Sequence, residues 1–461
     1  MRIKLDTPLS VHNIITVLPD LKACSANPNS VITHICTDSR LLEAGDLFIA
    51  IKGQRYDGNI FVNDANAIGA ITLGNTSTKS AIHVNSSESA ILSIAKYYKS
   101  LFKKLKATVA ITGSVGKTST KEFTQKILGY SCKTHANKGN YNNCIGLAHT
   151  IFTMPSDTEY LITEMGMNHL GEISALSKCA EPDIAIITNI GTSHIGNLGS
   201  KEAIAKAKTE IIHGMKNERV IIPYGEPLLD KIRTSLKVGY NCDAPYSLHQ
   251  SSNGQYTYSS PYGIIENIEL DDFAPHMLNN IAMSITAAVA LQISEENIKA
   301  GASIISNKDI RARFIKLDDF SIFDDSYNAS YESIIADILY LQKRFKDCPL
   351  GLFLGDIDEL GEMSEVIHSD IGKFIAECKS ISNLYLKGKY SLNIAESALA
   401  MGFDESKIHI NCCETNADES IRHIYEHHMH GEIILFKASH RHRFDKIADT
   451  LIEKERNRDD R

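Results

Sequence analysis

Short apolar runs alternate with amphipathic stretches along most of the chain, and this pattern predicts three successive α/β sections. In the first section, residues 1–105, an apolar run at residues 46–51 predicts a strand. Apolar positions spaced three and four apart in residues 91–106 predict a helix whose basic end suits a helix C-terminus. We place the first domain boundary after this helix.

The second section, residues 106–312, alternates predicted strands with predicted helices. The strands are residues 108–112, 160–163, 184–188 and 220–222, and the helices are residues 118–128, 171–180, 201–215 and 279–291. Strands that alternate with helices indicate a mainly parallel sheet. This section should therefore be an α/β domain with its own sheet.

The third section, residues 313–461, repeats this alternation. Its predicted strands are residues 321–323, 351–354, 383–386 and 433–436, and its predicted helices are residues 333–344, 368–377 and 392–400. A second α/β unit with its own sheet is expected. The tail, residues 453–461, is almost entirely charged, and we expect it to fray.

Composition limits the classes to which the protein can belong. The chain has 461 residues, of which 43% are hydrophobic and 23% are charged, as in a soluble globular protein. A net charge of −8 provides no overall attraction to nucleic acid or anionic lipid. Ten scattered cysteines without a C-x-x-C pair suggest reduced thiols in a cytoplasmic protein. We expect neither a signal peptide nor a membrane span, because no apolar run is long enough.

The most informative motif is the segment Thr112-Gly-Ser-Val-Gly-Lys-Thr-Ser, residues 112–119. It follows a predicted strand and opens a predicted helix, the context in which glycine-rich loops bind phosphate. Lys117 would reach the β- and γ-phosphates, and the hydroxyl of Thr118 would bind Mg²⁺. An ordinary glycine-rich turn is the alternative, but two glycines followed by Lys-Thr favour nucleotide binding.

Polar residues follow several of the predicted strands, where open α/β sheets bind their ligands. Glu164 and His194 come after two strands of the second section, and a carboxylate there can hold Mg²⁺. Taken alone, each is more often a surface or capping residue. In the third section polar clusters follow three strands, which predicts a shared ligand-binding edge: residues 324–328, 355–361 and 437–440. A capping turn explains the first cluster equally well.

These motifs occur in the order typical of the Mur ligases, the ATP-dependent amide-forming enzymes of peptidoglycan precursor synthesis, which the chain closely resembles. The resemblance runs from about residue 37 to about residue 450. Besides the phosphate loop, it rests on residues 37–40, 45–58, 139–143, 205–211, 324–328, 355–361 and 437–439. The motif Gly-Asp-Ile-Asp-Glu-Leu-Gly at 355–361 is typical of the branch that adds a dipeptide.

The resemblance implies a role for each matching residue. Residues expected at ATP are Gly113, Ser114, Val115, Gly116, Lys117, Thr118, Ser119, His276, Asn280, Arg313 and Asp325. Residues expected at the other substrates are Ser39, Arg40, Asn140, Asn142, Asn143, Asn328, Lys437 and Ser439. The implied metal ligands are Thr118, Glu164, His194 and Lys208, the last as a carbamate. The catalytic set would be Lys117, Lys208, His194 and Arg313.

The family also implies an architecture and a reaction. We expect a UDP-muramoyl-binding domain at 1–105, a central phosphate-loop domain at 106–312 and a C-terminal Rossmann-like domain at 313–461. The tripeptide carboxylate of UDP-N-acetylmuramoyl-tripeptide would be activated by ATP as an acyl phosphate, which the amine of D-alanyl-D-alanine would attack. Two Mg²⁺ ions would assist, and the protein would be a cytoplasmic monomer.

Three alternatives remain open. A sister ligase that adds the third residue shares the Asp-Ser-Arg motif at residues 38–40, and folylpolyglutamate synthetase shares the phosphate loop. A nucleotide-binding protein that has lost catalysis is the third. It is suggested by two departures from the family pattern, Cys144 in place of the usual Glu and His440 in place of the usual Arg.

Overall fold

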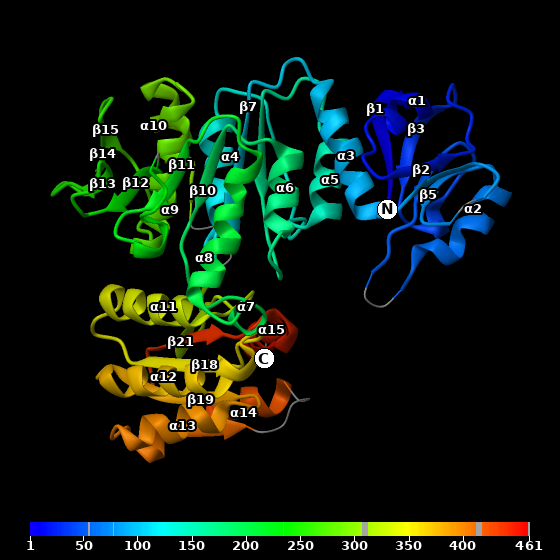
Figure 1. Ribbon diagram of the computed structural model, residues 1–461. Coiled ribbons are helices and arrows are strands. Elements are labelled where there is room, and N and C mark those ends of the chain that lie inside the picture. Colours follow the sequence, from blue (N-terminus) through cyan, green and yellow to red (C-terminus); the bar gives the residue numbers. More distant parts are fainter. Residues whose placement is uncertain (54–55, 77, 234, 307–311, 412–416, 460–461) are drawn as a thin grey trace.

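Three β-sheets follow one another along the chain in the computed structural model (Figure 1). The structure describes residues 1–461 apart from 54–55, 77, 234, 307–311, 412–416 and 460–461. Within these residues, two sheets have six strands and the central one has nine. No helix within these described residues is long and apolar enough to cross a membrane.

The first sheet is mixed, with strand order β1-β3-β4-β5-β6-β2. Its strands are β1 (Arg2–Ser10), β2 (Leu21–Cys24), β3 (Val31–Cys36), β4 (Leu47–Ile49), β5 (Ile71–Gly74) and β6 (Ala81–Val84). Four strands from β3 to β6 run parallel, and the two edge strands run antiparallel to their neighbours. The helices of this region are α1 (Val11–Thr16), α2 (Val62–Ala67), α3 (Ser87–Ser100) and the 3-10 helices Ser39–Leu41 and Gly58–Phe61. Helix α3 packs against the central unit.

The central sheet has strand order β15-β14-β13-β12-β11-β10-β7-β9-β8. Its strands are β7 (Ala107–Thr112), β8 (Thr134–Ala136), β9 (Tyr160–Glu164), β10 (Ile184–Ile187), β11 (Val220–Pro223), β12 (Ser235–Tyr240), β13 (Tyr246–Gln250), β14 (Tyr256–Ser260) and β15 (Gly263–Ile268). The run from β8 to β13 is parallel, which confirms the predicted mainly parallel sheet. Strands β14 and β15 are antiparallel additions.

Helices cover this central sheet and extend below it in Figure 1. They are α4 (Lys117–Gly129), α5 (Cys144–Phe152), α6 (Glu172–Ala180), α7 (Ile195–Leu198), α8 (Lys201–Thr209), α9 (Pro275–Ala290), α10 (Glu295–Ser303) and the 3-10 helices Glu210–Gly214 and Pro227–Leu229. The single helix predicted at residues 201–215 is thus an α-helix followed by a 3-10 turn.

The third sheet has strand order β16-β17-β21-β18-β19-β20, and all its strands except β16 run parallel to their neighbours. They are β16 (Arg313–Lys316), β17 (Phe320–Asp324), β18 (Leu350–Gly355), β19 (Ile381–Lys387), β20 (Ile408–Asn411) and β21 (Glu432–Lys437). The surrounding helices are α11 (Tyr331–Arg344), α12 (Ser364–Glu377), α13 (Ser391–Ala400), α14 (Ala417–His427), α15 (Phe444–Asp459) and the 3-10 helices Gly361–Met363, Glu405–Lys407 and His440–His442. The separate sheet predicted for this section is confirmed.

The tail that is expected to fray begins inside α15, which extends to Asp459, and the fraying stays a prediction. Ile447, Ala448 and Leu451 on α15 are buried in the core cluster of the third sheet. The helix is thereby held by its apolar face, and the hydroxyl of Tyr425 on α14 contacts Glu455.

Strand β7 fixes the place at which ligands can bind. All six of its residues are buried, and it lies between β9 and β10 in the sheet. After β7, the chain therefore first forms β8 and β9 on one side of that strand. It later forms β10 on the other side. Such a reversal opens a crevice at the carboxyl end of the strand, where open α/β sheets bind their ligands.

Candidate active site

A glycine-rich loop joins β7 to α4 and opens the site. Gly113 has φ 150°, and Gly116, the residue before α4, has φ 82°. A Cβ added at Gly113 would lie 1.8 Å from Oγ1 of Thr188, so no other residue fits there without a shift of backbone or neighbour. The loop therefore brings backbone N–H groups and the positive end of α4 to one point, which suits an anion.

The residues after β10 support this loop from the other side of the crevice. Oδ1 of Asn189 accepts hydrogen bonds from the backbone N–H groups of Ser114 (3.0 Å) and Val115 (2.8 Å). The Gly191 N–H donates to Oγ of Ser114 at 2.8 Å. Sequence reasoning missed Asn189, although its position just after a parallel strand was a usable signal.

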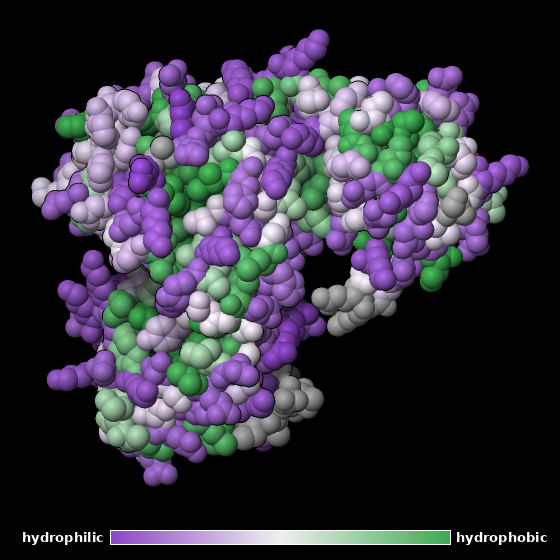
Figure 2. All heavy atoms as spheres, in the orientation of Figure 1, coloured by the Kyte–Doolittle hydropathy of each residue, from purple (hydrophilic) through white to green (hydrophobic). Residues whose placement is uncertain are grey.

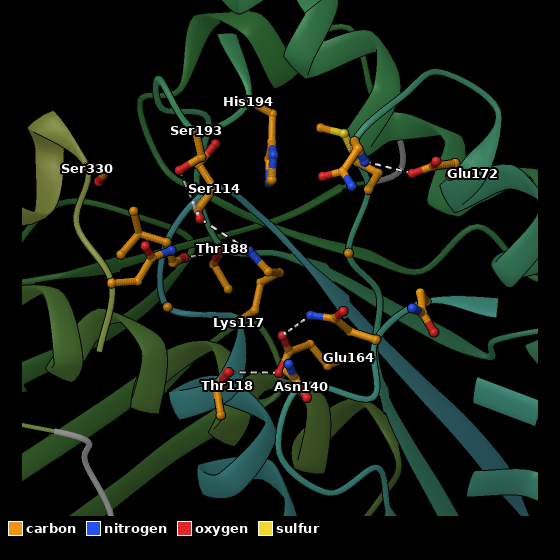
Figure 3. Close-up of a pocket in the computed structure, with 18 of the residues that line it drawn as sticks. Ser114, Lys117, Thr118, Asn140, Glu164, Glu172, Thr188, Ser193, His194 and Ser330 are labelled. Atoms are coloured by element: carbon orange, nitrogen blue, oxygen red, sulfur yellow. Dashed lines mark hydrogen bonds between the residues drawn. The ribbon is translucent and has the colours of Figure 1, made fainter. Parts of the chain in front are cut away.

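Lys117 and Thr118, the first two residues of α4, line the crevice (Figure 3). Nζ of Lys117 donates to the carbonyl oxygens of Gly113 (2.8 Å) and Ser114 (3.2 Å), so its charge lies over the loop. The hydroxyl of Thr118 donates to Oε2 of Glu164 at 2.8 Å. A cationic group and an oxygen-rich corner thus lie side by side.

Glu164 ends β9 and is only 3% exposed. Its second carboxylate oxygen, Oε1, accepts a hydrogen bond of 2.9 Å from the amide of Asn142. Its backbone is held by buried Asn137, whose Oδ1 accepts from the Glu164 N–H at 2.8 Å. Sequence reasoning missed Asn137, which no motif indicates. Carboxylate and hydroxyl oxygens in this corner are the donors that Mg²⁺ prefers.

Lys208 on α8 is a buried lysine, and no acidic partner faces it among the described residues. It is 2% exposed, and no hydrogen bond or ion pair joins its ammonium group to another described residue. Burial, together with the positive charge of Lys117, lowers the pKa of Lys208 well below its usual range. A neutral amine is therefore favoured, and a neutral amine is the form that reacts with electrophiles.

His194 precedes α7, and its ring points into the crevice (Figure 3). Its Nδ1 lies 2.5 Å from Oε2 of Glu359, which follows β18 in the third unit. Contact with His194 lowers the pKa of the Glu359 carboxyl. Beside this pair, the Gly196 N–H donates to the Glu359 carbonyl at 2.9 Å.

A second acidic residue of the third unit, Glu332, reaches the same loop. Its carboxylate accepts a hydrogen bond from Oγ1 of Thr192 at 2.9 Å and pairs with Lys201 at 3.2 Å. Glu332 and Glu359 therefore join the third unit to the segment that carries His194. Sequence reasoning assigned no role to Glu332, and it mentioned Glu359 only as part of a motif.

The third unit contributes a buried charged cluster at the carboxyl ends of β17 and β21. Lys437 contacts Asp325 and lies 2.7 Å from Asp337. Burial alone would lower the pKa of Lys437, but the two carboxylates outweigh burial and raise it. Burial and the nearby Asp337 raise the pKa of Asp325 to about 6. Strands β17, β21 and β18 are parallel neighbours, so the three predicted polar clusters do share one edge.

One cavity of about 1700 Å³ connects the three units. Figure 2 shows the surface deeply notched between the first and third units. Predicted residues that line the cavity are Ser114, Val115, Gly116, Lys117, Thr118, Ser119, Asn140, Asn142, Asn143, Glu164, His194, His276, Asn280, Asp325, Asn328, Lys437 and Ser439. Burial and the charge of Lys437 lower the pKa of His276 to about 4, so the ring is neutral near pH 7.

Other predicted residues are not among the described residues that line this cavity. They are Ser39, Arg40, Gly113, Lys208 and Arg313. Arg40 is exposed and pairs with Asp38 at 2.7 Å. Arg313 pairs with Asp324 at 2.6 Å and with Asp449 at 2.9 Å. Their predicted roles remain predictions.

The two departures noted in the sequence both lie at the cavity. Burial raises the pKa of the Cys144 thiol to about 11, so this position carries no negative charge near pH 7. The ring of His440 lies 5.1 Å from that of Tyr327. The next residue, Arg441, pairs with Asp358 at 2.6 Å. Its guanidinium also lies at the cavity.

Comparison with known proteins agrees with this architecture. Residues 111–288 match the family model of the Mur ligase middle domain. The UDP-N-acetylmuramoyl-tripeptide–D-alanyl-D-alanine ligase of Bacillus subtilis (strain 168) is 35% identical over 94% of this chain and 96% of its own length.

Solved structures show the same likeness. A crystal structure of MurF from Acinetobacter baumannii has a TM-score of 0.84 and 26% identity, covering 98% of this chain and 100% of that one. The ADP complex of MurF from Thermotoga maritima has a TM-score of 0.77 and 25% identity, covering 92% and 98%. The chain belongs to the Mur ligases, in the family of the UDP-N-acetylmuramoyl-tripeptide–D-alanyl-D-alanine ligases.

Proposed function

We propose that the protein joins D-alanyl-D-alanine to UDP-N-acetylmuramoyl-tripeptide in an ATP-dependent reaction. The observation that carries this proposal is a phosphate loop, with Thr118 bonded to Glu164, in a cavity that also reaches the first and third units. Relatives named for this reaction, one of them alignable over 94% of the chain, support the choice of substrates. ADP, phosphate and a UDP-muramoyl-pentapeptide are the products.

The reaction proceeds in two steps. An oxygen of the tripeptide's terminal carboxylate attacks the γ-phosphorus of ATP, the bond to the β-phosphate oxygen breaks, and an acyl phosphate and ADP form. The amine of D-alanyl-D-alanine then attacks the acyl carbon, phosphate leaves and the amine loses a proton. The charge of Lys117 and the N-terminus of α4 offset the negative charge that gathers on the phosphates.

We assign the metal ligands to Thr118, Glu164 and His194. The oxygens of Thr118 and Glu164 lie 2.8 Å apart, and Figure 3 shows the ring of His194 directed to the same space. Bound there, Mg²⁺ would neutralise phosphate charge. The hydrogen bond between Thr118 and Glu164 would yield to metal coordination by both oxygens.

We also assign a carbamate to Lys208. Its neutral amine nitrogen would add to the carbon of CO₂ and release one proton, which turns a buried neutral amine into a carbamate anion. That anion would balance the charge of Lys117 and of a metal ion. A ¹³C NMR carbonyl signal after incubation with ¹³C-bicarbonate tests the assignment. The signal should vanish in Lys208→Met and persist in the neighbouring Lys206→Met, and a signal unchanged in Lys208→Met would overturn it.

The remaining predicted residues fall into groups by position. We assign Asn140, Asn142, Asn143, Ser39 and Arg40 to the UDP-muramoyl-peptide, and Asn328, Lys437 and Ser439 to the incoming dipeptide. His276, Asn280 and Asp325 would contact the nucleotide. Arg313, now paired with Asp324, would reach the phosphates only after the third unit moves. The three sheets support a division into domains at 1–105, 106–312 and 313–461.

The direct test is phosphate release from MgATP by the purified protein. Release that requires both UDP-N-acetylmuramoyl-tripeptide and D-alanyl-D-alanine, together with a pentapeptide mass in the product, is the expected result. Release with single amino acids or with folates would move the activity to a sister ligase. ATP binding without any release would contradict a catalytic role.

A further inference from the structure

A cluster of metal-ligating side chains lies on the last turns of α14, apart from the cavity described above. His423, Glu426 and His427 each place one ligand atom within 4.8 Å of the other two. The two histidines are four residues apart and therefore share one face of the helix, with the carboxylate of Glu426 beside them. None of the three is among the described residues that line the cavity.

His423 carries the strongest sign that this cluster has a ligand. Its Nδ1 is buried, and it has no hydrogen-bond partner in the part of the chain that the structure describes. A buried polar atom left without a partner destabilises the folded state. An imidazole nitrogen with a free lone pair is a good ligand for a transition metal ion, so coordination would remove this destabilisation.

The histidine rings near this face are already stacked in order. The ring of His427 lies 4.0 Å from that of His409 on β20, with an angle of 15° between the planes, and 6.1 Å from that of His423. The amide of Asn383 on β19 donates to the His427 carbonyl at 3.1 Å and its Oδ1 lies 3.2 Å from Nε2 of His409. The sheet therefore holds the backbone of His427 in place.

We propose that α14 binds one divalent transition metal ion of the zinc class through His423, Glu426 and His427. Two imidazoles and a carboxylate are a ligand set for Zn²⁺ rather than for Mg²⁺, which prefers oxygen ligands. Bonds of about 2.0–2.2 Å bring ligand atoms closer together than 4.8 Å, and the exposed side chains of Glu426 and His427 can rotate to do so. Water completes the coordination.

The position of the site indicates a structural effect. Figure 1 shows α14 at the side of the third unit that faces away from the central sheet. An ion bound by three residues within two turns links those turns together, and binding to the folded form alone stabilises that form by mass action. Zn²⁺ should therefore raise the unfolding temperature of the third unit.

The test is calorimetric titration of the chelator-treated full-length protein with Zn²⁺ alone as the probe, in excess Mg²⁺ to occupy oxygen-rich sites. Wild-type protein should bind one more equivalent than His427→Gln or Glu426→Gln. The matched control is His430→Gln, because His430 is 89% exposed, lies three residues further on and is outside the cluster. It should keep that equivalent.

Two results would overturn the proposal: the same stoichiometry and affinity in wild type and His427→Gln, or an equal loss in the His430→Gln control. Thermal unfolding provides a second readout that does not depend on the number of other zinc sites. Zn²⁺ should raise the unfolding temperature of wild type and of His430→Gln, and it should raise that of His427→Gln less. Circular dichroism of each variant without metal shows that the fold is retained. An equal rise in all three proteins would also contradict the proposal.

Discussion

Nδ1 of His194 lies 2.5 Å from Oε2 of Glu359, and this contact joins the loop after β10 to the loop after β18. Both residues have left-handed backbone conformations, with φ 66° and 63°. Non-glycine residues keep such conformations where the surrounding structure holds them. A carboxylate beside Nδ1 would hold the ring in one orientation and would leave Nε2 for the proposed metal ion. The third unit thereby orients a residue of the central unit.

Glu359→Gln should weaken metal binding rather than nucleotide binding. Loss of a carboxylate that supports a metal-bound histidine typically reduces metal affinity or activity by about 10- to 100-fold. We therefore expect the Mg²⁺ concentration for half-maximal phosphate release to rise by a similar factor, as measured by titration of Mg²⁺ at fixed low ATP.

Glu362→Gln is the matched control for this change. Glu362 lies three residues further on in the 3-10 helix Gly361–Met363 and is exposed. It should leave the Mg²⁺ dependence as in wild type. An unchanged Mg²⁺ dependence in Glu359→Gln would show that the ion pair does not support the metal site.

Lys117→Ala should abolish most of the chemistry and leave the fold intact. The ammonium donates to two carbonyl groups of its own loop and lies at the cavity, outside the apolar core clusters. Removal of one group that stabilises transition-state charge costs about 10²- to 10³-fold in kcat. Steady-state phosphate release measures the loss, and thermal unfolding checks the fold. Lys126→Ala, near the other end of α4, should retain kcat; equal activity of the two variants would contradict the role of Lys117.

Local sequence patterns were sufficient to predict the phosphate loop and its surroundings. The apolar strand, the two glycines and the helix that starts at Lys117 are adjacent in the chain, so their order alone fixes their geometry. The contact between Thr118 and Glu164 could also be anticipated, since parallel neighbouring strands end at one edge of a sheet. The antiparallel strand β14 was missed because its Tyr, Thr and Ser residues form no apolar run. Strand β15 was missed because Glu266 and Asn267 interrupt its isoleucines.

Contacts between distant segments could not be predicted. Nothing in the sequence near His194 indicates that Glu359 contacts it, because the pair depends on how the third unit packs against α7. Likewise, Asn137 and Asn189 act through single amide groups, and asparagine is common in ordinary turns.

Gly196→Ala should test the contact between the central and third units. A Cβ at this residue would lie 2.5 Å from the backbone nitrogen of Gly361 and 2.7 Å from the carbonyl oxygen of Glu359. Relative to glycine, alanine favours an α-helix by about 1 kcal/mol. Any loss of stability or activity would therefore come from the clash. A displacement of reacting groups by about 1 Å can cost 10²-fold in rate, and we expect kcat to fall by about 10- to 100-fold while ATP binding changes little.

Asn197→Ala provides the comparison for this variant, because Asn197 is the next residue of α7 and is exposed. Its kcat should match that of wild type. ATP affinity, measured by equilibrium binding without the other substrates, separates the two parts of the site. A Gly196→Ala protein with normal kcat would show that the close approach of Gly196 and Gly361 is not needed in the reacting complex.

The last prediction concerns two neighbouring groups whose effects on stability oppose each other. Burial raises the pKa of Asp325 from 3.8 to about 6, and burial lowers the pKa of His276 from 6.5 to about 4. Between about pH 4 and 6 the folded chain therefore holds a proton on Asp325 that the unfolded chain has lost. In the same range it lacks a proton on His276 that the unfolded chain carries. As pH rises, stability falls through Asp325 and rises through His276, and the two contributions nearly cancel.

Single variants should separate these contributions. Asp325→Asn leaves His276, so the denaturant midpoint should increase from pH 4.5 to pH 6. The corresponding free energy of unfolding should rise by up to about 1.4 kcal/mol per pH unit relative to wild type. His276→Gln leaves Asp325, so the midpoint should decrease over the same range. The double variant should again follow the wild-type profile. Parallel profiles for the two single variants would mean that at least one of these groups keeps its ordinary pKa in the folded protein.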